Sequence, residues 1–458
     1  MPPSKGASWR RRPVWAPVLS FLWPGLGQMY LGRRRAGIVL AAGMAVGLFA
    51  AVVLVGGGVG AILAAIVNPQ TAAFIVSWVA VLGVVRVVAI LDAARPGKSP
   101  SPSRRGQAGV AALAIGLSLA VVVSHVTVAW VAYDAHVATA QIFGNDPAQT
   151  SPGPDAGLPS GSAIPLGSDY LGSAPPAVPP TGSRLNVLLI GADSGTGYRH
   201  ALTDSMIVVS ADKATGKVAM VSLPRDLARL RMYNGKIWGE KLNALVTLAN
   251  NRPSEFPLGG LATLTKQVGF MLGIPVNYYA YVNLAGFKKL VDAVGGVDVT
   301  VDSDIADSTY DLGGGQIGFY LKAGRRHLDG RLATAFVRSR HGPGGNDFTR
   351  ARRQQQIIIG LREKLNDPAM LTRLPDILAA APDVISTNYP PSKVGELLTL
   401  SQQLGDPTIE RVVLGPPYAV HPATSSTGGS YILTLVDKKV KALSVRLFGS
   451  DSAFFGAN

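Results

Sequence analysis

Acidic and basic side chains stand where three apolar, strand-like runs of this chain begin or end. Asp193 ends the first run and Asp204 opens the second. Two carboxylates at neighbouring strand ends suit one Mg²⁺, which commonly takes one or two carboxylates, several waters and the phosphate oxygens of a substrate. The spacing therefore predicts a Mg²⁺ site completed by an anionic substrate. The alternative is that both aspartates only cap strands or turn the chain.

The third run ends in Pro224, Arg225 and Asp226. Proline stops the strand and fixes the turn, so Arg225 would lie near the same sheet edge, and guanidinium groups bind phosphate with two hydrogen bonds. Asp226 would orient Arg225 or act as a base, unless the turn is simply solvated. Lys241 and Asn243 would reach a phosphate from an extended segment; otherwise they mark the start of a helix.

A second basic cluster lies further along the chain. Arg338 and Arg340 precede Arg350, and Gln354 follows Arg350 by four residues, which places these two on one face of a predicted helix. Arg338 and Arg340 share a face only if their segment is extended. Asp347 is the only acid in the cluster, so the arginines need another anion. A solvated basic face is the alternative.

Composition indicates membrane segments and excludes thiol chemistry. The chain has 458 residues, of which 47% are hydrophobic and 16% charged, and its mean hydropathy is +0.26. It has no cysteine, so disulfides and thiolate metal sites are excluded. Three apolar stretches reach the roughly 20 residues that span a bilayer. They are 36–57, 71–94 and 109–133, and they define a membrane region over 1–133.

The net charge of +15 lies mostly in this first region. Residues 1–108 hold twelve basic side chains and one acid. Eleven of the twelve basic side chains flank the apolar stretches, and Arg86 lies inside the second stretch. Positive loops beside membrane spans explain this better than nucleic-acid binding, and they place 1–35 and 95–108 in the cytoplasm. Three spans then put everything after Tyr133 outside the cell.

The rest of the chain divides into a linker and a folded domain. Residues 134–184 are rich in Pro, Gly, Ser and Ala and predict an extracellular tether. Residues 185–458 predict one three-layer α/β/α domain, because strands joined by a hairpin alternate with helical patterns. The predicted strands are 185–191, 205–211, 217–223 and 297–301, and the predicted helices are 259–272, 284–294, 329–338, 348–365, 369–380 and 391–404.

Taken in order, these segments resemble the LytR–CpsA–Psr family of cell-envelope proteins. The resemblance covers roughly residues 185–357, and the three-span N-terminus resembles an actinobacterial variant. Nine motifs carry it, at 186–193, 203–206, 221–226, 241–243, 273–279, 286–297, 327–330, 337–341 and 347–355.

The resemblance implies a multi-pass cell-membrane phosphotransferase with an extracellular catalytic domain. Such proteins transfer a glycopolymer from a polyprenyl diphosphate carrier to peptidoglycan, with Mg²⁺ and an arginine-rich pyrophosphate site beside a hydrophobic lipid groove. A sugar hydroxyl would attack the sugar-proximal phosphorus, and polyprenyl phosphate would leave. Carried over, the metal ligands are Asp193 and Asp204, and the pyrophosphate contacts are Arg225, Arg338, Arg340, Arg350 and Gln354. Lys241 and Asn243 match a further motif near the site and are predicted substrate contacts. Arg225 and Asp226 are the predicted catalytic pair, with Asp226 as the candidate general base.

One position departs from the family pattern. The family often has arginine where this chain has Leu202, and Arg199 in the neighbouring loop is the candidate to replace it. Two other functions stay open: a polyprenyl-diphosphate phosphatase with water as acceptor, and a non-catalytic membrane sensor or scaffold that binds lipid-linked glycan. A DNA-binding role is disfavoured, since the arginine cluster would lie outside the cell.

Overall fold

The structure is a computed structural model with two compact units, Met1–Val137 and Ala138–Asn458. The residues that it describes are 14–56, 65, 69–95, 104–143, 182–192, 202–341, 345–373, 377, 385–390, 393–404, 408–423, 427 and 430–449.

The first unit is helical, and three of its helices are long and apolar enough to cross a membrane, as predicted. These helices are α3 (Arg34–Gly56), α5 (Pro69–Ala94) and α6 (Arg104–Phe143). Their apolar parts are Arg34–Val53, Thr71–Ala94 and Gly106–Trp130. Because α6 continues to Phe143, the first ten residues of the segment predicted as linker are helical. The remainder of that segment, up to residue 181, lies outside the described residues.

Two short helices, α1 (Trp15–Leu22) and α2 (Leu26–Tyr30), pack against α5 in the same unit. Polar side chains make this contact. Gln28 is fully buried and its Nε2 donates to the carbonyl oxygen of Ala89 at 2.8 Å. Arg86 of α5 donates from Nη2 to the carbonyl oxygen of Phe21 at 2.7 Å. A charge inside a predicted span is thus turned towards a neighbouring helix, as an apolar surrounding demands.

A mixed six-stranded sheet is the centre of the second unit, with the order β11-β6-β1-β2-β3-β12. Its strands are β1 (Arg184–Ala192), β2 (Thr203–Asp212), β3 (Val218–Ser222), β6 (Tyr278–Asn283), β11 (Ile385–Thr387) and β12 (Ile409–Val413). The β1–β2 and β2–β3 pairs are antiparallel, whereas β6 runs parallel to β1 and β12 runs parallel to β3. The hairpin expected between the second and third strands is present.

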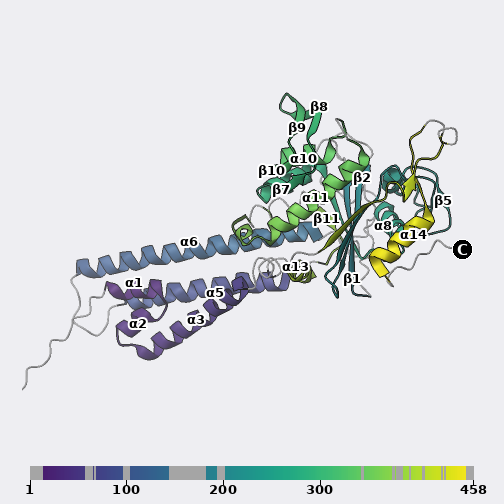
Figure 1. The fold of residues 1–458 in the computed structure, drawn as a ribbon. Helices are drawn as coiled ribbons and strands as arrows, with labels where there is room; N and C mark the ends of the chain where they lie inside the picture. The colour runs from purple at the N-terminus through teal and green to yellow at the C-terminus, as the bar shows by residue number, and fades with distance from the viewer. Residues whose placement is uncertain are drawn as a thin grey trace, which may run out of the picture. The chain divides into compact units, whose positions relative to one another are not determined.

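Helices cover both faces of this sheet, so the predicted α/β/α layering is confirmed (Figure 1). On one face lie α7 (Leu245–Asn250), α8 (Gly260–Leu272) and α14 (Asp437–Phe448), and on the other lie α11 (Asp347–Asn366) and α13 (Val394–Gln403). Side chains of β1 alternate between the two cores: Leu188 and Ile190 pack in the larger one, and Leu185 in the smaller one with Leu400 of α13. Two buried faces require a nearly continuous apolar strand.

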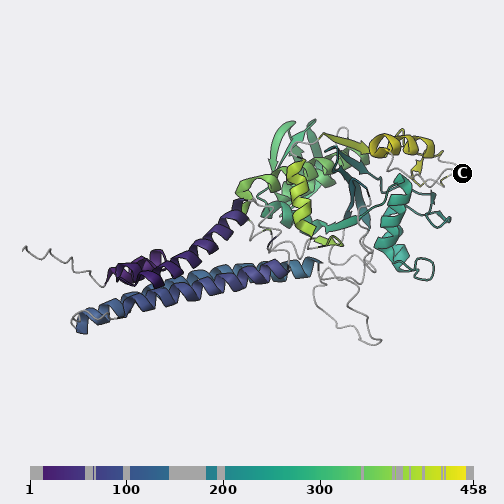
Figure 2. The same cartoon turned by 90° about the horizontal axis from the view of Figure 1, so that it is seen from below.

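A smaller substructure extends the domain and has its own apolar core (Figure 2). It comprises α9 (Leu284–Ala293), β7 (Val297–Val301), β8 (Ile305–Gly313), β9 (Gln316–Leu321), β10 (Gly324–Leu328) and α10 (Gly330–Arg338). The strand predicted at 297–301 is β7, and among the described strands it pairs with β10 alone, outside the six-stranded sheet. Gly360 of α11 lets this substructure approach, because a Cβ there would stand 2.7 Å from the carbonyl oxygen of Asp298.

One buried amide fixes α11 against the sheet. Gln355 is fully buried, and its Nε2 lies 2.9 Å from Ser222 Oγ on β3 and 3.0 Å from the carbonyl oxygen of Val412 on β12. Buried polar groups that lose their partners are strongly destabilising. Gln355 therefore sets where the first turn of α11 stands relative to the end of β3.

We expect Gln355→Leu to lower the free energy of unfolding by about 1–3 kcal/mol, because buried acceptors on two strands lose their donor. Thermal unfolding of the full chain in detergent measures this. Gln356→Leu is the matched control, since Gln356 is partly exposed and donates to the carbonyl oxygen of Thr300 at 2.9 Å. Equal melting temperatures for the two variants would contradict the assignment.

Candidate functional site

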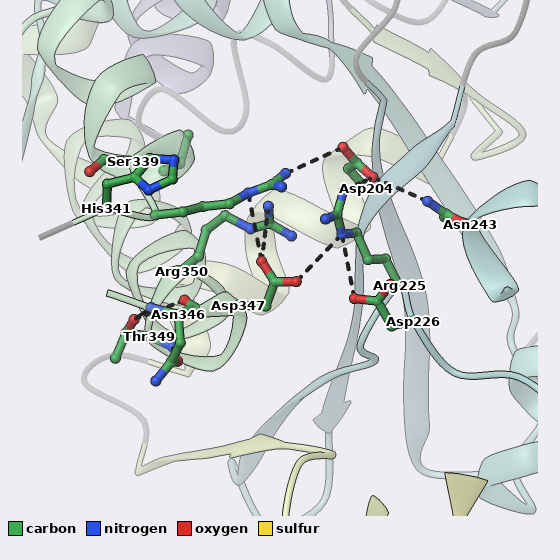
Figure 3. A network of polar contacts seen from close by, with 12 residues as sticks. Asp204, Arg225, Asp226, Asn243, Ser339, His341, Asn346, Asp347, Thr349 and Arg350 are labelled. Carbon is green, nitrogen blue, oxygen red and sulfur yellow. Dashed lines mark hydrogen bonds and ion pairs between the residues drawn. The ribbon is translucent and has the colours of Figure 1, made fainter. Parts of the chain in front are cut away.

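Several segments of the chain deliver charged side chains to one end of the sheet. β1 ends where β2 begins, with Ala192 opposite Thr203. The chain leaves β3 at the same end, where the Leu223 amide donates to the carbonyl oxygen of Met206 at 2.8 Å. Asp204 thus stands beside the turn that carries Arg225 (Figure 3). The first turn of α11 and the segment after α10 complete the site.

Arg225 is the centre of this cluster. Its Nη1 donates to Asp204 Oδ1 at 3.1 Å, and its Nε lies 3.5 Å from Asp347 Oδ2 and 3.7 Å from Asp226 Oδ2. Burial opposes the charge, but the three carboxylates outweigh it and raise the pKa of Arg225. Nε is nevertheless buried without a hydrogen-bond partner among the described residues. The Arg225 guanidinium is therefore held by one hydrogen bond and by ion pairs, and its Nε is a donor without a hydrogen bond in the described part of the chain.

Asp347 joins the three arginines of the site. Its carboxylate lies 3.3 Å from Arg350 Nη1 and 3.6 Å from Arg340 Nε, in addition to Arg225. Burial would raise the pKa of Asp347, but the charges of Arg350, Arg225 and Arg340 hold it below its ordinary value. Asn346 forms a capping box with Thr349, so Asp347 occupies a fixed first helical turn, where the helix dipole also favours an anion.

Sequence reasoning did not select Asp347 as a site residue. One signal for it was available: it is the only acid within the arginine-rich segment. Arginines from separate elements cannot share a pocket without an anion between them, and the nearest acid in the chain was a candidate for that place. The structure puts Asp347 there.

Arg340 and Arg350 approach from the α10–α11 side. Arg340 Nη2 lies 3.8 Å from Asp204 Oδ2, so its guanidinium bridges Asp204 and Asp347. Arg350 is only 5% exposed, and burial is the main reason why its pKa falls to about 10, with Arg340 and Arg225 adding to the effect. The guanidinium groups of Arg225 and Arg350 carry charge at neutral pH.

Lys241 and Asn243 close the β3 side of the site. Lys241 Nζ lies 2.5 Å from Asp226 Oδ1, and Asn243 Nδ2 donates to Asp204 Oδ1 at 3.4 Å. The main-chain amide of Asn243 also donates to the carbonyl oxygen of Arg225 at 3.2 Å. The segment begins a short helix, η1 (Leu242–Ala244), after an extended Lys241. The motif therefore starts a helix and also reaches the charged cluster, and its contact with a phosphate stays a prediction.

Two other predicted contacts lie on α10 and α11. Arg338 is exposed in the last turn of α10. Gln354 donates from Nε2 to the carbonyl oxygen of Val337 at 3.4 Å, joining α11 to α10. Asp193 and Arg199 lie outside the described residues.

The described acidic side chains offer few ligands for a divalent cation. Within the described part of the chain, no group of three or more His, Cys, Asp or Glu side chains is arranged to hold a metal. Asp204 contributes one carboxylate, whose two oxygens face Arg225, Asn243 and Arg340. Mg²⁺ needs only one or two protein carboxylates when phosphate oxygens complete its shell, so Asp204 fits such a sparse site.

An apolar groove of about 880 Å³ runs along α8. One wall is a face of α8 with small residues, including Ala262 and Gly269, together with Phe270. The other wall comes from the hairpin of β4 (Leu230–Arg231) and β5 (Ile237–Trp238), with Leu258 contributing as well. None of the charged residues of the cluster lines it. It is a separate, mostly apolar surface of the same unit.

Acid should weaken the cluster through Asp347. Its depressed pKa adds stability that is present above the unfolded-state pKa of about 4 and is lost as pH falls through the lower folded-state value. We expect wild type to melt higher than Asp347→Asn at pH 7, with the difference shrinking towards zero below about pH 4. Melting temperatures between pH 7 and pH 3 measure this. A difference that is constant with pH would contradict the ion pairs.

This chain is similar in sequence to known proteins. The chain is 34% identical over 204 residues to a Bacillus cereus (strain AH820) protein named polyisoprenyl-teichoic acid–peptidoglycan teichoic acid transferase TagU. The match covers 44% of this chain and 60% of that protein, so the chain spans less than two thirds of its relative. A Staphylococcus aureus (strain COL) protein named regulatory protein MsrR is 32% identical over 213 residues, covering 46% of this chain and 58% of that protein.

Among solved structures, Bacillus subtilis TagV aligns with a TM-score of 0.46 at 24% identity, covering 58% of this chain and 96% of that one. The model of the LytR_cpsA_psr family matches residues 175–446, which include the whole six-stranded sheet and every described member of the charged cluster. Over more than half of its length, therefore, this chain belongs to the LytR–CpsA–Psr family.

Proposed function

We propose that this protein is a phosphotransferase that attaches a glycopolymer from a polyprenyl diphosphate carrier to peptidoglycan. One observation carries the proposal: Arg225, Arg340 and Arg350 come from three elements and meet on one carboxylate, Asp347. Three guanidinium groups around a shared anion suit a diphosphate, which offers several oxygens in a fixed geometry. The name of the TagU relative describes a transfer of this kind.

In the proposed reaction, a sugar hydroxyl of peptidoglycan attacks the phosphorus nearest the glycopolymer. A new O–P bond forms, the bond from that phosphorus to the bridging oxygen breaks, and polyprenyl phosphate leaves. Arg225, Arg340 and Arg350 stabilise the charge on the equatorial and leaving oxygens, which is where most of the catalysis of phosphoryl transfer lies.

Asp226 and Asp347 have different roles in this proposal. Asp226 is buried, and its oxygens face Lys241 and Arg225, so it orients Arg225. Asp347 is more exposed and loses its arginine partners to the incoming diphosphate. Its pKa then rises, and it accepts the proton of the attacking hydroxyl.

We also propose Mg²⁺ as the cofactor, held by Asp204 and Asp193. When bound, the ion neutralises charge on diphosphate oxygens. Asp204 is placed for this by β2, and the pairing of Ala192 with Thr203 brings the end of β1 beside it. The arginine and asparagine contacts of Asp204 fix the direction of its carboxylate.

The proposed location is the cell membrane, with three spans and the catalytic unit outside the cell. The support is the charge pattern: eleven of the twelve basic residues of 1–108 flank the apolar stretches. An extracellular site gives access to both the lipid-linked donor and the peptidoglycan acceptor. The groove along α8 is the proposed place of the polyprenyl chain, because its lining is mostly apolar.

The test is product analysis with the full chain in detergent, a short-chain polyprenyl diphosphate-linked disaccharide and a peptidoglycan fragment, with and without Mg²⁺. We expect Mg²⁺-dependent attachment of the disaccharide phosphate to the fragment. Arg225→Lys should lower this rate by about 100-fold, since lysine cannot provide two parallel donors. Arg326→Lys is the matched control, because the Arg326 side chain is partly exposed and donates to the nearby carbonyl oxygens of Lys322 and Ala323.

Two results would overturn the proposal. Release of the disaccharide phosphate into water at the same rate with and without acceptor would identify a phosphatase. Saturable donor binding with no product in either case would identify a sensor or scaffold.

We expect Leu258→Asp to weaken binding of the polyprenyl chain in the groove along α8, because a carboxylate in an apolar groove is costly to desolvate. We expect the KM for an undecaprenyl-linked donor to rise while the KM for a farnesyl-linked donor stays unchanged. Initial rates with both donors measure this. An equal change for both chain lengths would place the polyprenyl chain elsewhere.

A further inference from the structure

A buried carboxylate on β8 contacts the segment that carries Arg340. Asp307 is 1% exposed, and its Oδ2 accepts a hydrogen bond from Ser339 Oγ at 2.7 Å and one from the His341 amide at 3.3 Å. Its Oδ1 accepts from the hydroxyl and the amide of Thr309 at 3.0 and 3.3 Å. Both oxygens are therefore committed, and Oδ2 serves the two residues on either side of Arg340.

These hydrogen bonds anchor the segment that follows the end of α10. Helix α10 ends at Arg338, and Ser339 is extended, with ψ of 129°. Without an anchor, the arginine that follows would sit on a loop. Ser339 is 1% exposed and is fixed a second time, because Arg353 Nη1 of α11 donates to its carbonyl oxygen at 3.1 Å.

The surroundings of the Asp307 carboxylate favour its charged form. Burial alone would raise the pKa of Asp307, but hydrogen bonds from Ser339, Thr309 and the His341 amide keep it below its ordinary value. Arg353, whose guanidinium stacks on the Phe336 ring at 5.6 Å, adds an attractive charge nearby. An ionised carboxylate accepts stronger hydrogen bonds than a neutral one.

We propose that Asp307 is the positioning residue for Arg340: from β8 it fixes the main chain on both sides of that arginine and so sets the guanidinium between Asp204 and Asp347. The inference rests on the proposed phosphotransferase function. Asp307 itself touches none of the three cluster carboxylates in the described structure and acts only through Arg340. A site residue displaced by about 1 Å loses much of its effect on the rate, which makes such an anchor valuable.

The experiment compares Asp307→Asn with Asp311→Asn in the full chain. Asp311 is the matched control, since it lies on the same strand, is exposed, and accepts only a local bond from the Gly313 amide at 2.7 Å. Two readouts are used: labelling of Arg340 by phenylglyoxal, followed by peptide mass, and steady-state kcat and KM with the disaccharide donor. The first needs no activity, so failure of the inference and failure of the proposed function are separable.

We expect Asp307→Asn to speed the labelling of Arg340 severalfold and to lower kcat by about tenfold or more, because the guanidinium is no longer held in place. In an Arg340→Ala background, Asp307→Asn should cause no further loss of kcat, since coupled residues are not additive. Ser339→Ala, which removes only the 2.7 Å bond, provides a milder variant if Asp307→Asn melts too early to assay.

Unchanged labelling of Arg340 in both Asp307→Asn and Ser339→Ala would overturn the inference. So would an additive loss of kcat in the Arg340→Ala background, which indicates a purely structural role. Faster labelling in a chain whose wild type transfers nothing would uphold the positioning of Arg340 and reject only the phosphotransferase.

Discussion

Repulsion among cations is the constraint on which the site depends. Arg225, Arg340 and Arg350 converge at one end of the sheet, and Lys241 stands beside them. Like charges in a partly buried pocket are tolerated only with anions between them. Three described carboxylates, Asp204, Asp226 and Asp347, supply these anions. The described cluster is therefore held together by attraction between opposite charges.

The sheet turns separate motifs into one site. Antiparallel pairing joins the end of β1 to the start of β2, and antiparallel pairing of β2 with β3 returns the chain to that same end. Asp204 and Arg225 are 21 residues apart in sequence and 3.1 Å apart in space for this reason. Apolar side chains on both faces of the strands make this register costly to shift, because a slip by one residue would exchange the two cores.

Buried polar side chains, more than apolar contacts, aim the site's charges. Gln355 fixes α11 against β3 and β12, and with it the turn that bears Asp347. Asp307 fixes the segment after α10, and with it Arg340. Apolar packing is tolerant of small rotations, whereas a buried hydrogen bond is strongly directional and expensive to break. Such bonds suit elements whose position must be exact within the reach of a guanidinium group.

The sequence by itself determined the fold class, the three apolar helices, the family and most of the polar residues of the site. Period-two and helical patterns and short motifs are local, so strands near β1, β2 and β3 and helices near α8 and α10 could be found without coordinates. Only the tertiary structure decided which charges meet. Asp347, Asp307 and Gln355 contact partners 122, 32 and 133 residues away along the chain, which are Arg225, Ser339 and Ser222. Pairing across such distances depends on how strands register and helices pack, which no local pattern records.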